Sequence, residues 1–144
     1  MSPPSPRIPR RTASDWRLLI GAVAAQMAVA GALRMASLPK IRTGAAQLRA
    51  VWHVLLPGSD ERVLWAIDAT GRRLTGISTC LVRAIVVEAR LTTAERPLRL
   101  TIGVMRPSGG ALQSHAWVLD AERVLVGGPI DADIASIVVW ETVA

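Results

Sequence analysis

The chain has 144 residues, which is enough for one domain with a hydrophobic core. Apolar residues make up 51% and charged residues 19% of the chain, a composition that excludes an intrinsically disordered protein. A single cysteine excludes a framework of intramolecular disulfides, and only two histidines accompany it, which excludes a classical structural zinc site. We therefore expect a folded, cytoplasmic protein without a bound metal.

The formal net charge is +6, and much of it precedes the main domain. A basic segment of this kind can indicate a nucleic acid or a membrane surface as a partner. No aromatic residues alternate with the arginines, and no known nucleic-acid-binding motif is present, so we expect no nucleic-acid partner. The basic residues concerned are Arg7, Arg10, Arg11, Arg17, Arg34 and Lys40.

Residues 1–14 form a basic, proline-rich segment that contains too few apolar residues for a core, and we expect a disordered tail. Residues 15–57 are predicted to form an N-terminal helical region. Its first helix is expected over residues 16–37, with Ser14 or Asp15 as the N-cap.

This first helix contains an uncharged run from Leu18 to Leu33, which suggests three interpretations. The run is shorter than the roughly 20 residues of a membrane-spanning helix, it is rich in alanine and glycine, and Gln26 lies in its middle. A membrane-associated helix and a cleaved signal peptide are the alternatives. We favour a helix that packs in this protein or against a partner, because small residues allow another helix to approach closely.

A second helix is expected over residues 41–56, and residues 58–144 are predicted to form the core of the protein. Asp60 can cap a helix that ends near Leu74. Gly76, Ser78 and Thr79 are turn and N-cap residue types, so the next helix is predicted to start at about Cys80. Its apolar residues recur at helical spacing, at Leu81, Ala84 and Ile85.

The pattern after this helix is that of strands. Residues 98–104 alternate apolar with polar or small residues, and a turn at 107–110 separates them from a second run at 113–119. A tight connection at 121–122 leads to a third strand at 123–126, and residues 137–140 can supply a last one. The predicted fold class is α+β, in which N-terminal helices are followed by a cysteine-bearing helix packed on an antiparallel sheet.

Cys80 and His115 carry the candidate chemistry. A thiol in the first turn of a helix lies at the positive end of the helix dipole, which favours the nucleophilic thiolate. His115 on a following strand can serve as its general base, and Trp117 would point to the same side of that strand. The backbone amide of Cys80 can donate to a developing oxyanion. His53 has no acid or thiol near it in sequence and is interpreted as a surface or packing residue.

Several blocks of the sequence resemble the lasso-peptide leader peptidases, which are stand-alone, microcin-processing-type cysteine proteases of the transglutaminase-like superfamily. The most specific blocks are Cys80-Leu81-Val82-Arg83-Ala84 and His115-Ala116-Trp117-Val118, in this order. The remaining ones are Trp65-Ala66-Ile67-Asp68, Arg72-Arg73-Leu74, Ile102-Gly103-Val104 and Arg123-Val124-Leu125. The resemblance covers roughly residues 16–128, and it implies a transglutaminase-like, papain-like fold.

The resemblance also implies a function. Such proteins are cysteine endopeptidases that remove the leader peptide from a ribosomally made precursor during its maturation. They act with a small leader-recognition protein and with an asparagine-synthetase-like macrolactam synthetase, which uses ATP, whereas the peptidase itself needs no cofactor. By position, Cys80 matches the family's nucleophile and His115 its general base.

The family's third catalytic residue has no counterpart at the corresponding positions of this sequence. Many family members have an Asn-Asp pair at the positions that correspond to Val126 and Gly127. A two-residue turn at 121–122 would pair Leu119 with Val124 and place Gly127 or Gly128 beside His115, where no side chain can orient the imidazole. We take Asp131 as the candidate, with Asp120, Glu122 or Asp133 as alternatives, and a backbone carbonyl could perform the same role.

Two other functions agree with these residues. A non-catalytic transglutaminase-like module could hold the biosynthetic enzymes together, and an acyl transferase could pass the acyl group to an amine instead of water. The leader peptidase is the interpretation that we favour.

Overall fold

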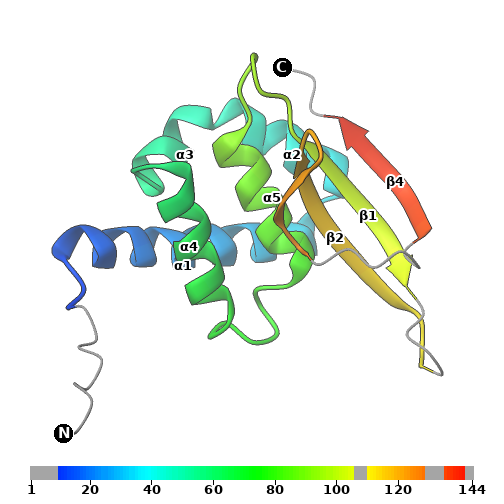
Figure 1. Cartoon of the computed structure of the whole chain (residues 1–144), viewed down its shortest axis with the longest axis horizontal. Helices are drawn as coiled ribbons and strands as arrows, with labels where there is room; N and C mark the ends of the chain where they lie inside the picture. Colours follow the sequence, from blue (N-terminus) through cyan, green and yellow to red (C-terminus); the bar gives the residue numbers. More distant parts are fainter. Residues whose placement is uncertain (1–9, 106–109, 129–134, 142–144) are drawn as a thin grey trace, which may run out of the picture.

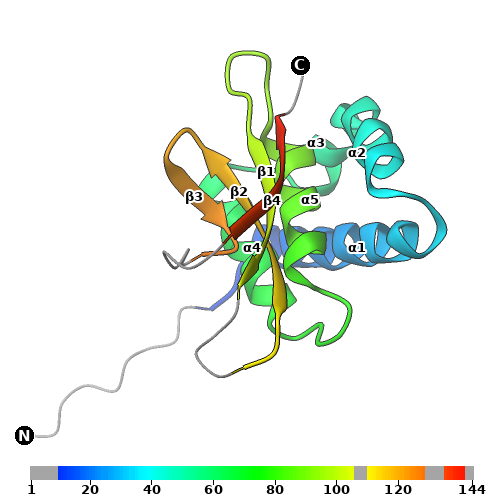
Figure 2. The same cartoon turned by 90° about the vertical axis from the view of Figure 1, so that its right-hand side faces the viewer.

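A computed structural model of the protein describes residues 10–105, 110–128 and 135–141. Within them, helices come first in the chain and strands follow (Figure 1). The helices are α1 (Ala13–Met35), α2 (Leu38–Gln47), α3 (Arg49–Leu55), α4 (Asp60–Gly71) and α5 (Cys80–Leu91). The strands are β1 (Arg99–Met105), β2 (Gln113–Asp120), β3 (Arg123–Val126) and β4 (Ala135–Glu141). The helices lie on one side of the sheet (Figures 1 and 2), which confirms the predicted α+β class.

Helix α1 begins earlier than the sequence predicted. Thr12 is the N-cap, and its side chain accepts a hydrogen bond from the Asp15 amide while the Asp15 carboxylate accepts one from the Thr12 amide. This reciprocal capping box satisfies two amides that would otherwise lack acceptors at the helix start. Ser14 and Asp15, the expected caps, therefore lie inside the first turn.

The same helix packs against α4, α5 and α3, as the favoured interpretation predicted. Leu18, Ala22 and Ala25 are buried on its inner face. A β-carbon on Gly21 would lie 1.9 Å from the carbonyl oxygen of Leu55, so only glycine lets α3 approach this closely. Among the described residues α1 is the one helix long and apolar enough to cross a membrane, with a mean hydropathy of 1.7 over a window that is 39% buried.

A break at Leu48 divides the second expected helix into α2 and α3. The Leu48 backbone, with φ −95° and ψ 27°, leaves the helical region there. The Trp52 indole N–H donates to the Ala45 carbonyl at 2.9 Å and so satisfies an acceptor near the end of α2. Trp52 itself is buried, and it fixes the angle at which the two short helices join.

Helix α5 lies at the centre of the fold, between the other helices and the sheet (Figure 1). It begins at Cys80, as predicted, because the Thr79 side chain accepts a hydrogen bond from the Val82 amide at 3.3 Å. Residues 84–91 are all buried, including Glu88, which forms an ion pair with Arg42 of α2. The rigid position of α5 fixes the place of its first residue, the cysteine.

The sheet has the strand order β3-β2-β1-β4, and its neighbouring strands are antiparallel. The tight turn at 121–122 pairs Leu119 with Val124, which confirms the predicted hairpin register. A register shift follows, so that Val118 pairs with Val126. Strand β4 begins two residues earlier than expected and pairs with the other side of β1.

Candidate functional site

Cys80 and His115 line one cleft, about 550 Å³ in volume, between the start of α5 and the end of β3. Both residues are partly buried. The last described pair between β2 and β3 is Val118 with Val126, and Gly127 follows alongside the backbone of Ala116 and Trp117. The two side chains form no direct hydrogen bond with each other in this structure, an arrangement common in enzymes without bound substrate.

The imidazole of His115 is oriented by a backbone carbonyl. Its Nε2 forms a hydrogen bond with the Gly127 oxygen, and because a carbonyl can only accept, Nε2 carries the proton. In the neutral ring Nδ1 is then the unprotonated nitrogen, and within the described residues it has no hydrogen-bond partner. The prediction that Gly127 or Gly128 lies beside His115 is confirmed, and the carbonyl performs the orienting role.

Glycine is required at position 127 by its surroundings. Its φ is +90°, and a β-carbon there would lie 2.3 Å from the Ala116 oxygen and 2.8 Å from the Trp117 Cα. These are atoms of the β2 backbone, which cannot shift without breaking the sheet. A side chain at this position would therefore displace the carbonyl that holds His115.

Trp117 lies beside His115, as the alternation along β2 predicts. The two ring centroids are 6.0 Å apart, and the ring planes are tilted by 32°. Trp117 is only 3% exposed, so its ring is a fixed wall for the imidazole. This contact limits the orientations of His115 from one side, while the Gly127 carbonyl limits them from the other.

The first turn of α5 leaves the backbone amide of Cys80 available to an oxyanion. The Val82 amide donates to the Thr79 side chain and the Arg83 amide to the Thr79 carbonyl. Within the described residues the Cys80 amide has no acceptor. It is therefore free to donate to an oxygen that approaches the thiol, as the sequence suggested.

The acidic residues proposed to orient His115 occupy other places. Asp120 accepts a hydrogen bond from Arg96 Nε at 2.7 Å, and the same arginine pairs with Asp60, so Asp120 belongs to an ion cluster at the far end of β2. Glu122 is fully exposed, 3.9 Å from Arg99. Asp131 and Asp133 lie outside the described residues.

Two charged residues of the cleft were not singled out from the sequence. The Asp68 carboxylate lies 3.8 Å from an Arg83 guanidinium nitrogen, and both residues line the cleft with Cys80. Asp68 also pairs with Arg72 at 3.3 Å and is 55% exposed. Asp68 and Arg83 lie in two of the blocks that carry the family resemblance, Trp65-Ala66-Ile67-Asp68 and Cys80-Leu81-Val82-Arg83-Ala84. This resemblance was the signal in the sequence that could have identified them.

A buried chain of hydrogen bonds supports the segment that leads to Cys80. Arg83 Nε donates to Ser78 Oγ at 2.9 Å, and Ser78 Oγ donates to Gln26 Oε1 of α1. Gln26 Nε2 in turn donates to Thr70 Oγ1 at 2.7 Å, and Thr70 donates to the Ala66 carbonyl at 2.7 Å. Each hydroxyl thus donates once and accepts once, so the loop before the cysteine is tied to α1 and α4.

Gly71 makes room for this chain. A β-carbon on Gly71 would lie 2.6 Å from Arg83 Nε and 2.7 Å from Ser78 Oγ. The last residue of α4 must therefore lack a side chain so that the arginine and the serine can meet. Sequence reasoning missed Gln26 in this role, because its partners lie far from it along the chain.

A thiol at a helix start and an imidazole on a following antiparallel strand are the residue types that cysteine hydrolases and acyl transferases use. The chain belongs to the transglutaminase-like superfamily, whose family model matches residues 13–139. This superfamily includes cysteine peptidases and transferases. Comparisons with curated proteins and with solved structures gave no match.

Proposed function

We propose that the protein is a cytoplasmic cysteine endopeptidase that removes the leader peptide from a lasso-peptide precursor. The observation that carries the proposal is the shared cleft, in which Cys80 opens α5 and His115 is held by the Gly127 carbonyl. The order of the Cys-Leu-Val-Arg-Ala and His-Ala-Trp-Val blocks supports the leader-peptidase assignment within the superfamily.

The reaction follows from these positions. The Cys80 thiolate attacks the scissile carbonyl, and the resulting oxyanion accepts a hydrogen bond from the Cys80 amide. His115, protonated as the thiolate forms, gives its Nδ1 proton to the departing amine, which leaves an acyl-enzyme. Water then attacks the thioester while His115 takes its proton, and the carboxylate product leaves with Cys80 regenerated.

Partner proteins complete the proposal. The precursor's leader is the substrate, a small leader-recognition protein presents it, and an asparagine-synthetase-like enzyme closes the ring with ATP. The peptidase step itself requires no cofactor. A cleft of this size can accept an extended peptide, and backbone hydrogen bonds would bind it with little demand on its sequence, so partners would supply most of the specificity.

The test is a cleavage assay with purified precursor, leader-recognition protein and peptidase, followed by mass spectrometry. We expect Cys80→Ala and His115→Ala to abolish cleavage, whereas His53→Ala, a change of the exposed second histidine, should cleave at the wild-type rate. Full cleavage by Cys80→Ala would contradict the proposal. Product formation with Cys80→Ala in the complete pathway would indicate a non-catalytic module.

Two further arms separate the remaining alternatives. Incorporation of a labelled amine at the cleavage site, in preference to water, would indicate an acyl transferase. Asp131→Ala tests the side-chain candidate for orienting His115, and we expect little change in the rate, because the Gly127 carbonyl already accepts the Nε2 hydrogen bond. Clearly slower cleavage would assign the orienting role to Asp131. A rate equal to that of the wild type would leave the Gly127 carbonyl as the orienting group.

A further inference from the structure

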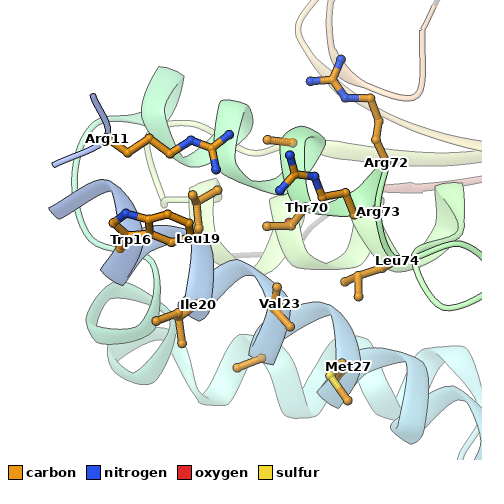
Figure 3. A pocket seen from close by; sticks show the side chains of 12 residues that line it. Arg11, Trp16, Leu19, Ile20, Val23, Met27, Thr70, Arg72, Arg73 and Leu74 are labelled. Carbon is orange, nitrogen blue, oxygen red and sulfur yellow. The ribbon is translucent and has the colours of Figure 1, made fainter. Parts of the chain in front are cut away.

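A second concave surface lies away from the thiol cleft, between α1 and the last turn of α4 with the residues that follow it (Figure 3). This groove has a volume of about 630 Å³. Its α1 wall includes three large apolar side chains that are exposed: Trp16 at 52%, Ile20 at 67% and Met27 at 53%. Exposed apolar side chains gathered in a groove indicate a binding surface.

The rim of the groove is positively charged. Arg11 and Arg73 both line it, and Figure 3 shows their guanidinium groups directed toward each other over Leu19 and Thr70. The Arg11 guanidinium lies 5.5 Å from the centre of the Trp16 ring, which fixes it at the mouth. Arg72 is directed away and pairs with Asp68.

No acidic residue lines the groove, and within the described residues Arg73 has no ion-pair partner. Two like charges over an apolar floor favour an occupant that brings carboxylates to them. Residues 1–9 contain arginine and no acidic residue, so charge complementarity disfavours this segment of the chain as the occupant.

The spacing of the wall residues indicates the shape of the occupant. Trp16, Ile20, Val23 and Met27 follow one another at intervals of four, three and four residues along α1. Such a row forms a ridge roughly 16 Å long, or three helical turns. With α4 as the opposite wall, the groove fits a third helix laid along it. A concave surface suits a helix better than a flat membrane.

We propose that this groove binds a short amphipathic helix of a partner protein, with apolar residues at i, i+3, i+4 and i+7 and with acidic residues that reach Arg11 and Arg73. The inference does not depend on the proposed peptidase activity, because binding is measured without cleavage. The groove and the thiol cleft share no lining residue, although Ala69 of the groove and Asp68 of the cleft are neighbours on α4.

The test begins with a displayed library of random 16-residue peptides selected on the full chain. We expect the enriched peptides to combine acidic residues with an apolar helical face. The leading peptide is then synthesised with a fluorophore, and its affinity is measured by anisotropy. Arg73→Glu should weaken binding by at least about tenfold, the equivalent of about 1.4 kcal/mol. Ala24→Trp, which fills the groove with an indole, should weaken it as strongly.

The matched control is Arg17→Glu, which makes the same charge change at an exposed α1 position outside the groove. It should leave the affinity within about twofold of the wild type, because exposed charges at a distance are screened. Circular dichroism of each variant confirms that it is folded before its affinity is compared.

Four outcomes would overturn the proposal. The first is a failure to enrich peptides, or enrichment of peptides without acidic residues. The second is equal binding by wild type and Arg73→Glu. The third is cosedimentation of the chain with phosphatidylglycerol vesicles that Ala24→Trp abolishes, which would assign the groove to a membrane. The fourth is a dimer in light scattering that Ala24→Trp dissociates, which would assign it to a second copy.

Discussion

Replacing Gly127 by alanine should damage both the fold and the site. The φ of +90° at this position is unfavourable for any residue with a β-carbon. The new methyl group would also lie 2.3 Å from the Ala116 oxygen, a backbone atom of β2. The chain after β3 must therefore move away from β2, and the carbonyl that holds His115 moves with it.

The magnitude can be estimated from these contacts. A left-handed backbone costs about 1–2 kcal/mol for a residue with a side chain. Loss of the His115–Gly127 hydrogen bond adds about 1 kcal/mol. The expected loss of unfolding free energy is therefore about 2–3 kcal/mol, which for a chain of this size lowers the Tm by roughly 5–10 °C.

The assay is thermal unfolding followed by circular dichroism, with Gly128→Ala as the control. Among the described residues, a β-carbon on Gly128 would meet only the Val124 side chain, with Cγ1 nearest at 3.3 Å, and this side chain can shift. This control should stay within about 0.5 kcal/mol of the wild type. Equal unfolding temperatures for the two alanine variants would contradict the close approach of Gly127 to the β2 backbone.

A second readout separates stability from the site. At a temperature where Gly127→Ala is folded, its leader cleavage should be at least about tenfold slower, because His115 has lost its orienting acceptor. Alkylation of Cys80 by iodoacetamide at neutral pH should also change in rate, while Gly128→Ala should match the wild type in both measurements. Unchanged cleavage would show that the carbonyl does not orient the base.

Three other predictions follow from the packing and from one shifted pKa. Gln26→Leu leaves the Thr70 and Ser78 hydroxyls without their partner and should lower the unfolding free energy by about 1–3 kcal/mol in urea titrations. The control Gln47→Leu, at an exposed position, should change it by less than about 0.5 kcal/mol. Equal effects would contradict the buried network. Gly21→Ala should lower the Tm, because its β-carbon would lie 1.9 Å from the carbonyl that closes α3, while Gly31→Ala, with nothing within 4 Å, should raise stability by about 0.5–1 kcal/mol. A higher Tm for Gly21→Ala than for Gly31→Ala in calorimetry would refute the close approach of α1 and α3. Desolvation and nearby arginines lower the pKa of His53 below 6.5, so the folded state binds fewer protons there than the unfolded state. The stability contributed by neutral His53 is present above pH 6.5 and is lost as the pH falls through the folded pKa. In a plot of unfolding free energy against pH, His53→Gln should flatten this range. An NMR titration of His53 with a midpoint above 6.5 would show that the sign is wrong.

The parts of the fold that the sequence predicted well depend on local signals. Thr79 followed by an apolar helical repeat predicted the start of α5 at Cys80, because capping is decided within one turn. The turn at 121–122 likewise predicted the pairing of Leu119 with Val124. The start of α1 was misplaced although its signal is local, since Thr12 and Asp15 have the spacing of a capping box.

The parts that could not be predicted depend on contacts between distant residues. Gln26 looked like a weak point of an apolar helix, and its partners Thr70 and Ser78 are 44 and 52 residues away. The break at Leu48 depends on how α2 and α3 pack around Trp52, which no local pattern reveals. The cleft itself was predicted only in part, because the block that ends in Asp68 carried the family resemblance but did not place this residue beside Cys80.

The hydrogen bonds of Gln26 have a consequence for dissecting this protein. The sequence suggests that residues 58–144 could be separated from the helices before them. Such a fragment would lack the acceptor for the Ser78 hydroxyl and the apolar side chains of α1 that cover α4 and α5. We expect it to aggregate when expressed alone and to regain solubility when residues 10–57 are supplied as a second chain. Helix α1 resembles a cleaved signal peptide in composition, but we expect the fold of residues 58–144 to depend on it.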